Sequence, residues 1–185
     1  MKKVSEAILF QGNWLSIKES TFITDSGKSI KWESIGRKKN PLAFAILAKL
    51  IPSNKYLLIK QFRHTINNYF IGLPAGITPK TPISECELDE CILKELLEET
   101  GYKGKIIKKS PVLKVNPGVM DDNFLIASIE VNESDPSNKN VKQCLDSSED
   151  IQVLIVQESE IENYLLSEKM GGTDISAGLW FLFCV

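Results

Sequence analysis

The chain has 185 residues, a formal net charge of −2 at pH 7, 43% hydrophobic residues and 25% charged residues. This length predicts one domain with room for a small appendage, and the composition is typical of a soluble globular protein with a sizeable core. A net charge near zero excludes a global electrostatic field that would attract nucleic acid. No stretch predicts a signal peptide or a membrane span, so we expect no membrane partner.

The four cysteines are scattered, and only one histidine, His64, accompanies them. No two cysteines have the CxxC spacing, so the pattern disfavours a zinc site. Cysteines without pairing signals are typical of a reducing compartment, and we therefore expect a cytoplasmic protein. The cysteines are Cys86, Cys91, Cys144 and Cys184.

The first part of the chain predicts a β-hairpin. Residues 14–20 and 29–35 have the character of strands, and the Asp-Ser-Gly-Lys sequence at 25–28 is suited to the turn between them. A lone hairpin is marginal in water, so it must pack on the main domain or on another subunit. Trp14 and Trp32 have two interpretations: they anchor a core or interface, or they stack on a planar base.

Three apolar runs, at 42–50, 56–63 and 69–73, predict strands that lead into Pro74-Ala75-Gly76. The second run ends in Arg63, a cation at a strand end. The polar loop that follows it contains His64, which we interpret as a solvated residue.

The segment 85–100 predicts a helix that carries three carboxylates on one narrow arc. Glu98 and Glu99 follow Glu95 by three and four residues, and Gly101 is a helix stop. Like charges at this spacing repel each other and weaken a helix. The arc is either an ordinary acidic face or a site for a hard divalent cation such as Mg²⁺, with Mn²⁺ as an alternative.

The second half predicts further strands, a turn at Pro117-Gly118, and two helices. A polar loop at 132–150 is long enough to be functional, and Glu149 stands near its end. The expected strands are 105–115, 124–129 and 151–156, and the expected helices are 158–166 and 175–183, the last capped by residues 171–174.

Two segments together resemble the signature of the Nudix hydrolases, in the ADP-ribose and ADP-sugar pyrophosphatase branch. They are Leu73-Pro74-Ala75-Gly76 and Lys94-Glu95-Leu96-Leu97-Glu98-Glu99-Thr100-Gly101, in which Lys94 replaces the usual arginine. The resemblance covers about residues 12–180 and implies the Nudix α/β/α sandwich with an N-terminal β-hairpin arm. We place the arm at residues 1–38, for dimerisation and base stacking, and the Nudix domain at 39–185.

The chain departs from the family pattern between Gly76 and Lys94. The spacing is 18 positions, about four more than usual, and two prolines in the excess predict a rigid enlarged loop at 77–84. The position of the family's first glutamate falls on Cys86, flanked by Glu85 and Glu87.

The resemblance implies metal-dependent hydrolysis of the diphosphate of ADP-ribose or a related ADP-sugar, which gives AMP and a sugar phosphate. Glu95, Glu98, Glu99 and the Ala75 carbonyl would hold Mg²⁺. Glu149 would act as the general base, and Asp146 and Asp150 are nearby alternatives for that role.

The resemblance also implies how the substrate is bound. Trp14 and Trp32 would sandwich the adenine in a homodimer whose arms are exchanged, and Arg37 and Arg63 would contact the phosphates. The alternatives are a Nudix hydrolase of another nucleoside diphosphate, such as GDP-mannose or NADH, and a non-catalytic nucleotide-binding sensor.

Overall fold

The structure is a computed structural model that describes all residues from 1 to 185. The chain forms two compact units. The first comprises Met1–Ala43, Ile77–Ile83 and Pro111–Leu125, and the second comprises Phe44–Gly76, Ser84–Ser110 and Ile126–Val185. None of the helices is both long and apolar enough to span a membrane.

The first unit is built on a three-stranded antiparallel sheet in the order β1-β2-β3. Its strands are β1 (Lys2–Gln11), β2 (Leu15–Ile23) and β3 (Ser29–Arg37). The predicted hairpin is confirmed, because Ile23 pairs with Ser29 across a turn in which Gly27 has a φ of 80°. The edge strand β1 is a strand that the sequence did not indicate: all ten of its residues are exposed, so no buried face marks it.

Two later segments join the first unit. Thr78, in the enlarged loop, is 1% exposed, and its backbone N–H donates to the Leu42 carbonyl at 2.9 Å. The Leu42 N–H donates in turn to the Thr78 hydroxyl at 3.0 Å. In the other segment, the N–H of Ile35 donates to the Val119 carbonyl at 2.8 Å. These bonds fix both loops to the first unit.

The second unit contains the large mixed sheet. The sheet has eight strands in the order β11-β6-β5-β4-β9-β8, with β10 paired to β5 and β7 paired to β4. Its strands are β4 (Leu42–Ile51), β5 (Lys55–Arg63), β6 (Asn68–Gly72), β7 (Ala75–Ile77), β8 (Lys105–Lys109), β9 (Asn123–Asn132), β10 (Ile151–Gln157) and β11 (Asp174–Ile175). The first residues of β4 and β9 and the last of β7 belong to the first unit.

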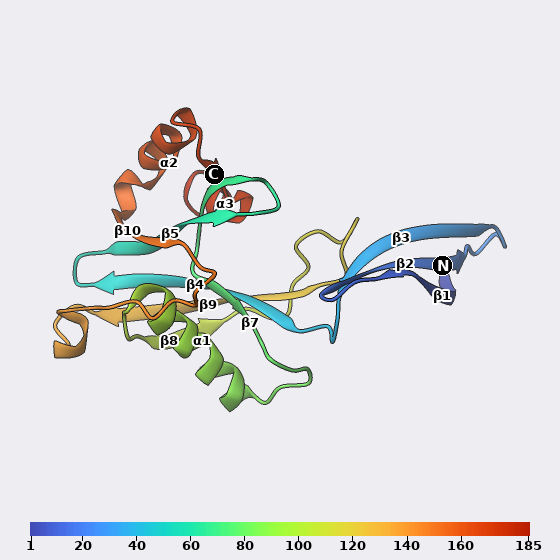
Figure 1. Cartoon of the computed structure of the whole chain (residues 1–185), viewed down its shortest axis with the longest axis horizontal. Coiled ribbons are helices and arrows are strands. Elements are labelled where there is room, and N and C mark those ends of the chain that lie inside the picture. Colours follow the sequence, from blue (N-terminus) through green and yellow to red (C-terminus); the bar gives the residue numbers. More distant parts are fainter. The chain divides into compact units, whose positions relative to one another are not determined.

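Helices cover both faces of this sheet in the second unit, as Figure 1 shows, with α1 on one side and α2 and α3 on the other. Side chains along β5 alternate between the faces, so Tyr56 and Leu58 join a core cluster with α2 and α3. The expected α/β/α sandwich is confirmed. The helices are α1 (Glu85–Thr100), α2 (Ile161–Met170) and α3 (Ala177–Phe183), and short 3₁₀ turns lie at Pro136–Asn138 and Glu158–Glu160.

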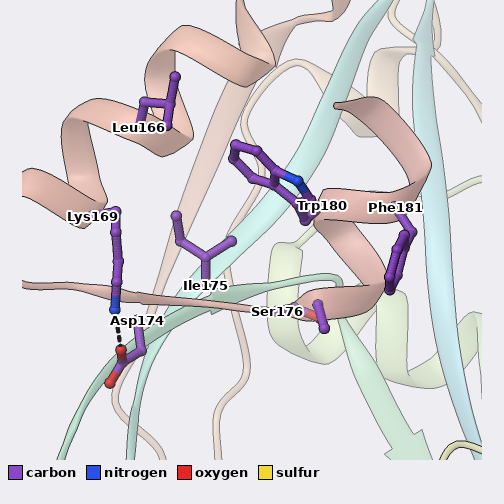
Figure 2. Close-up of a pocket in the computed structure, with 8 residues that line it drawn as sticks. Leu166, Lys169, Asp174, Ile175, Ser176, Trp180 and Phe181 are labelled. Atoms are coloured by element: carbon purple, nitrogen blue, oxygen red, sulfur yellow. Dashed lines mark hydrogen bonds and ion pairs between the residues drawn. The ribbon is translucent and has the colours of Figure 1, made fainter. Parts of the chain in front are cut away.

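The C-terminal elements frame an open, mostly apolar hollow of about 400 Å³, shown in Figure 2. Leu166 on α2, Ile175 on β11 and Trp180 on α3 line it, and an ion pair of 2.6 Å joins Lys169 to Asp174 beside it. Leu179 of α3 is buried and anchors the helix in the core cluster.

Two predicted elements are shorter than expected. The strand expected at 105–115 ends at Lys109, because Pro111 removes a backbone donor, and Leu113 makes only an isolated bridge with Phe124. The helix expected at 175–183 begins at Ala177. Ser176 caps it by accepting a hydrogen bond from the Leu179 N–H at 3.4 Å, whereas Asp174–Ile175 forms a short strand beside β6.

Candidate functional site

Helix α1 presents three glutamates along one side, as its sequence predicts. It begins at a capping box formed by Ser84 and Glu87 and ends at Gly101, whose φ of 77° is the left-handed conformation that favours glycine. The buried residues Leu88, Ile92 and Leu96 pack one face against the sheet. This packing fixes the rotation of the helix, so the positions of the glutamates follow from it.

Glu99 is the most buried of the three carboxylates, with 3% exposure. Its Oε2 accepts a hydrogen bond from the backbone N–H of Ala75 at 2.9 Å. The preceding residue, Pro74, is held in place because its carbonyl accepts from the Ile46 N–H at 2.8 Å. The Pro-Ala-Gly turn and the end of α1 therefore meet, as the two halves of the sequence signature predict.

The loop before β10 brings a second set of acids to the helix. Glu149 closes a small turn in which its Oε2 accepts from the Asp146 N–H at 2.9 Å and its own N–H donates to the Asp146 carbonyl at 3.0 Å. Helix and loop together enclose a polar cavity of about 160 Å³. The residues that line the cavity are Lys94, Glu95, Glu98, Glu99, Cys144, Asp146 and Glu149.

Each carboxylate in this cavity makes ionisation of its neighbours less favourable. Burial, followed by the charges of Glu149 and Glu98, raises the pKa of Glu95 to about 7. Burial also raises the pKa of Glu99 to about 8, with smaller contributions from Glu95 and Glu149, although the bond from the Ala75 amide opposes this shift. Both groups therefore hold protons near neutral pH that isolated carboxylates would have lost.

The donor set fits a hard divalent cation. No three His, Cys, Asp or Glu side chains converge closely enough to form a ready-made metal site. However, the cavity crowds several oxygen donors together, and two of its carboxylates, Glu95 and Glu99, have raised pKa values. A bound cation would favour the ionised form of these carboxylates and so relieve their mutual repulsion. Lys94 partly fills this role for Glu98, with its Nζ 2.7 Å from Glu98 Oε2.

Arg63 interacts electrostatically with a helix carboxylate. It is the last residue of β5 and is exposed, and its positive charge lowers the pKa of Glu99. It is therefore close enough to the cavity to interact with an anionic group there.

The first unit carries the other three predicted binding residues. Trp14 is 83% exposed, whereas the indole Nε1 of Trp32 donates to the Gly118 carbonyl at 3.3 Å. Arg37 forms an ion pair of 3.0 Å with Asp122. Trp32 pairs with Ser20 across the sheet. Trp14 comes just before β2, six residues before Ser20, and its carbonyl accepts from the Lys38 N–H at 2.9 Å, so the backbones of the two tryptophans are about 20 Å apart along the strand direction.

The glutamates at the start of α1 do not reach the cavity. Glu87 accepts from the Ser84 N–H at 3.0 Å, and Glu85 pairs with Lys109 on β8. They stand eight to ten residues before Glu95, which is about 12–15 Å along a helix. Neither of them lines the cavity, and Glu87 instead supports the helix start.

No family model matches the chain. A Nudix hydrolase of Schizosaccharomyces pombe is 34% identical over 166 residues, which cover 85% of this chain and 78% of that protein. The chain belongs to the Nudix hydrolase family. An ADP-sugar pyrophosphatase of Mus musculus is 26% identical over 165 residues, which cover 85% of this Nudix hydrolase and 73% of the mouse protein.

A solved structure described as an ADP compounds hydrolase has the same fold. It superposes with a TM-score of 0.66 at 15% identity, and the match covers 92% of this Nudix hydrolase and 94% of the other chain. The predicted family and fold are thus confirmed together.

Sequence reasoning missed two residues at the cavity of this Nudix hydrolase. Cys144 lines it, and Gln143 beside it bonds to the end of α1. No periodicity or motif marks either residue, because both lie in an irregular loop whose contacts are distant in sequence.

Gly76 is the residue in the signature that leaves room for a carboxylate. A Cβ at this position would lie 2.7 Å from Glu95 Cδ and 2.8 Å from Phe44 Cζ. We expect Gly76→Ala to push Glu95 aside and to raise the metal concentration required for half-maximal activity by about 10-fold or more, as for residues that orient ligands. Metal titration of activity measures this effect. Gly178→Ala is the control, because a Cβ there meets nothing closer than 3.6 Å.

Proposed function

We propose that this Nudix hydrolase cleaves the diphosphate of ADP-ribose or a related ADP-sugar to give AMP and a sugar phosphate. The observation that carries the proposal is the cavity in which Glu95, Glu98 and Glu99 face Glu149. Such a set of acids suits a reaction that needs a bound cation and a base near one phosphate. The named activity of the mouse relative supports the choice of substrate.

The cofactor in this proposal is Mg²⁺, with Mn²⁺ as an alternative. Nudix pyrophosphatases generally depend on a divalent cation. The carboxylates of Glu95, Glu98 and Glu99 and the carbonyl of Ala75 would hold it. When bound, the cation neutralises phosphate oxygens and acidifies a water molecule.

The protein groups would divide the remaining chemistry. Glu149 would orient the attacking water and accept its proton, a role that suits a loop carboxylate at the cavity. Arg63 would draw the anionic diphosphate toward the carboxylates. Arg37, which forms an ion pair with Asp122 in the free chain, would give up that pair and contact the phosphates or adenosine of the substrate.

The proposed base site needs a second copy of the chain. Two indoles that sandwich one base stand about 7 Å apart, twice the contact distance of carbon atoms, which is far less than the separation of about 20 Å between Trp14 and Trp32 in one chain. We therefore propose a homodimer in which Trp14 of one protomer and Trp32 of its partner stack on the two faces of the adenine. In this dimer the arm formed by residues 1–38 is exchanged between the protomers.

We also propose that the protein is cytoplasmic.

AMP release from ADP-ribose in the presence of Mg²⁺ tests the function directly. We expect wild-type turnover, and a decrease in kcat of about 10²- to 10⁴-fold in Glu149→Gln because the general base is lost. Glu130→Gln, an exposed acid on β9 outside the cavity, is the matched control and should retain full activity.

Each alternative gives a different result in the same assay. Turnover of GDP-mannose or NADH in preference to ADP-sugars would assign another substrate to the same site. Nucleotide binding without turnover in either Mg²⁺ or Mn²⁺ would contradict catalysis and favour a sensor.

A further inference from the structure

Gln143 joins the helix that carries the acids to the strand that follows the loop. Its side-chain Nε2 donates to the Glu99 carbonyl at 2.6 Å and to the Ile151 carbonyl at 3.1 Å. A primary amide has two N–H groups, so both bonds form at once. One side chain thus connects the last turn of α1 to the first residue of β10.

The backbone beside Gln143 strengthens this attachment. The N–H of Cys144 donates to the Glu98 carbonyl at 2.9 Å. A Cβ on Gly101 would lie 2.7 Å from the backbone N of Lys142, so the loop packs directly on the helix end. The last carbonyls of a helix lack partners within the helix, and residues 143 and 144 supply partners for two of them.

The far end of the loop has its own attachment. The hydroxyl of Tyr69 on β6 donates to Asp150 Oδ2 at 2.8 Å, and the Tyr69 ring packs edge-on against Phe62 with centroids 5.6 Å apart. Residues 145–149 therefore span two fixed points. The span carries two acids, Asp146 and Glu149, and Glu149 lies next to the second fixed point.

We propose that Gln143 is a positioning residue for catalysis, which holds Glu149 at a set distance from Glu95, Glu98 and Glu99. It touches neither substrate nor metal in this role and acts through the loop. Because a displacement of about 1 Å at a reacting group costs about 10²-fold in rate, a bond that fixes the base against the metal carboxylates has a large effect. The inference rests on the proposed function of Glu149.

The variant Gln143→Met keeps the length of the side chain and removes both donors. We expect kcat to decrease about 10- to 100-fold, with KM changed by less than about 2-fold because the residues that bind substrate are unaltered. Gln157→Met is the matched control: Gln157 Nε2 also donates to a backbone carbonyl, that of Ser53 at 3.2 Å, at the other end of β10. It should leave kcat unchanged.

Amide hydrogen exchange gives a readout that does not depend on activity. In Gln143→Met, peptides covering residues 144–150 should exchange faster, and the middle of α1 should not. Unchanged exchange in the loop would overturn the inference, even if the wild type hydrolysed none of the substrates and the proposed function itself had failed.

A double-mutant cycle separates positioning from general destabilisation. In a Glu149→Gln background, Gln143→Met should change kcat by less than about 2-fold, because no base remains to be positioned. A decrease as large as that in the wild type would show that Gln143 acts by another route and would contradict the proposal. If Glu149→Gln alone is fully active, the proposed role of the base is wrong, and this positioning role is wrong with it.

Discussion

Replacing Glu99 with glutamine is expected to slow hydrolysis strongly and at the same time to stabilise the metal-free protein. A ligand carboxylate contributes several kcal/mol of charge stabilisation through the cation, which corresponds to a decrease in kcat of about 10²- to 10⁴-fold. Stability should change in the opposite direction. Glu99 is 3% exposed and repelled by Glu95 and Glu149, and glutamine removes the buried charge while keeping an acceptor for the Ala75 N–H.

The pH dependence of this stabilisation follows from the pKa of Glu99. The pKa is about 8 in the folded protein against an ordinary value of 4.5, so between these values the folded state binds a proton that the unfolded state has lost. Stability of the metal-free wild type should therefore fall as pH rises from about 4.5 to about 8. Glu99→Gln should lack this decrease in stability with pH. The difference in stability between the variant and the wild type should therefore be greatest above pH 8.

Thermal denaturation in EDTA at pH 5, 7 and 9 measures the effect. A gain of 1 kcal/mol raises Tm by about 2–4 °C in a chain of this size. Added Mg²⁺ should raise the wild-type Tm and leave that of Glu99→Gln almost unchanged. A variant that is less stable than wild type at pH 9 without metal would contradict the proposed crowding of carboxylates, and Glu130→Gln controls for the general loss of one negative charge.

Separate replacement of Trp14 and Trp32 by alanine is expected to weaken substrate binding in each homodimer and to be partly complemented in the mixed dimer. Loss of one stacking face costs about 1–3 kcal/mol, so KM for ADP-ribose should rise roughly 5- to 150-fold in each variant. If each site takes Trp14 from one protomer and Trp32 from its partner, a dimer of the two variants contains one intact site and one doubly altered site.

Co-expression of the two variants with different tags tests this arrangement. Tandem purification of the mixed dimer should recover about half of the sites with the wild-type KM, because one of its two sites is intact. A mixed dimer with no site of wild-type KM would contradict a base site made of Trp14 from one protomer and Trp32 from its partner. A monomeric protein would contradict the dimer itself. Trp180, on α3 beside the C-terminal hollow, provides the control: Trp180→Phe should not change KM.

The sequence alone determined α1 and the family, because both depend on local spacing. Glu95, Glu98 and Glu99 share an arc through the helical repeat, and Gly101 ends the helix through its own backbone preference. The apolar runs that became β4, β5 and β10 were recognisable for the same reason.

Only the tertiary structure decided which groups meet these carboxylates. The resemblance favoured Glu149 as the base and left Asp146 and Asp150 as alternatives, and no local pattern showed which of these loop acids meets the helix. The fold turns Glu149 and Asp146 toward the cavity, whereas Asp150 accepts a bond from Tyr69. The bonds of Gln143 and the separation of Trp14 from Trp32 likewise depend on chain packing and strand register. Such contacts join residues far apart in sequence, so no local pattern encodes them.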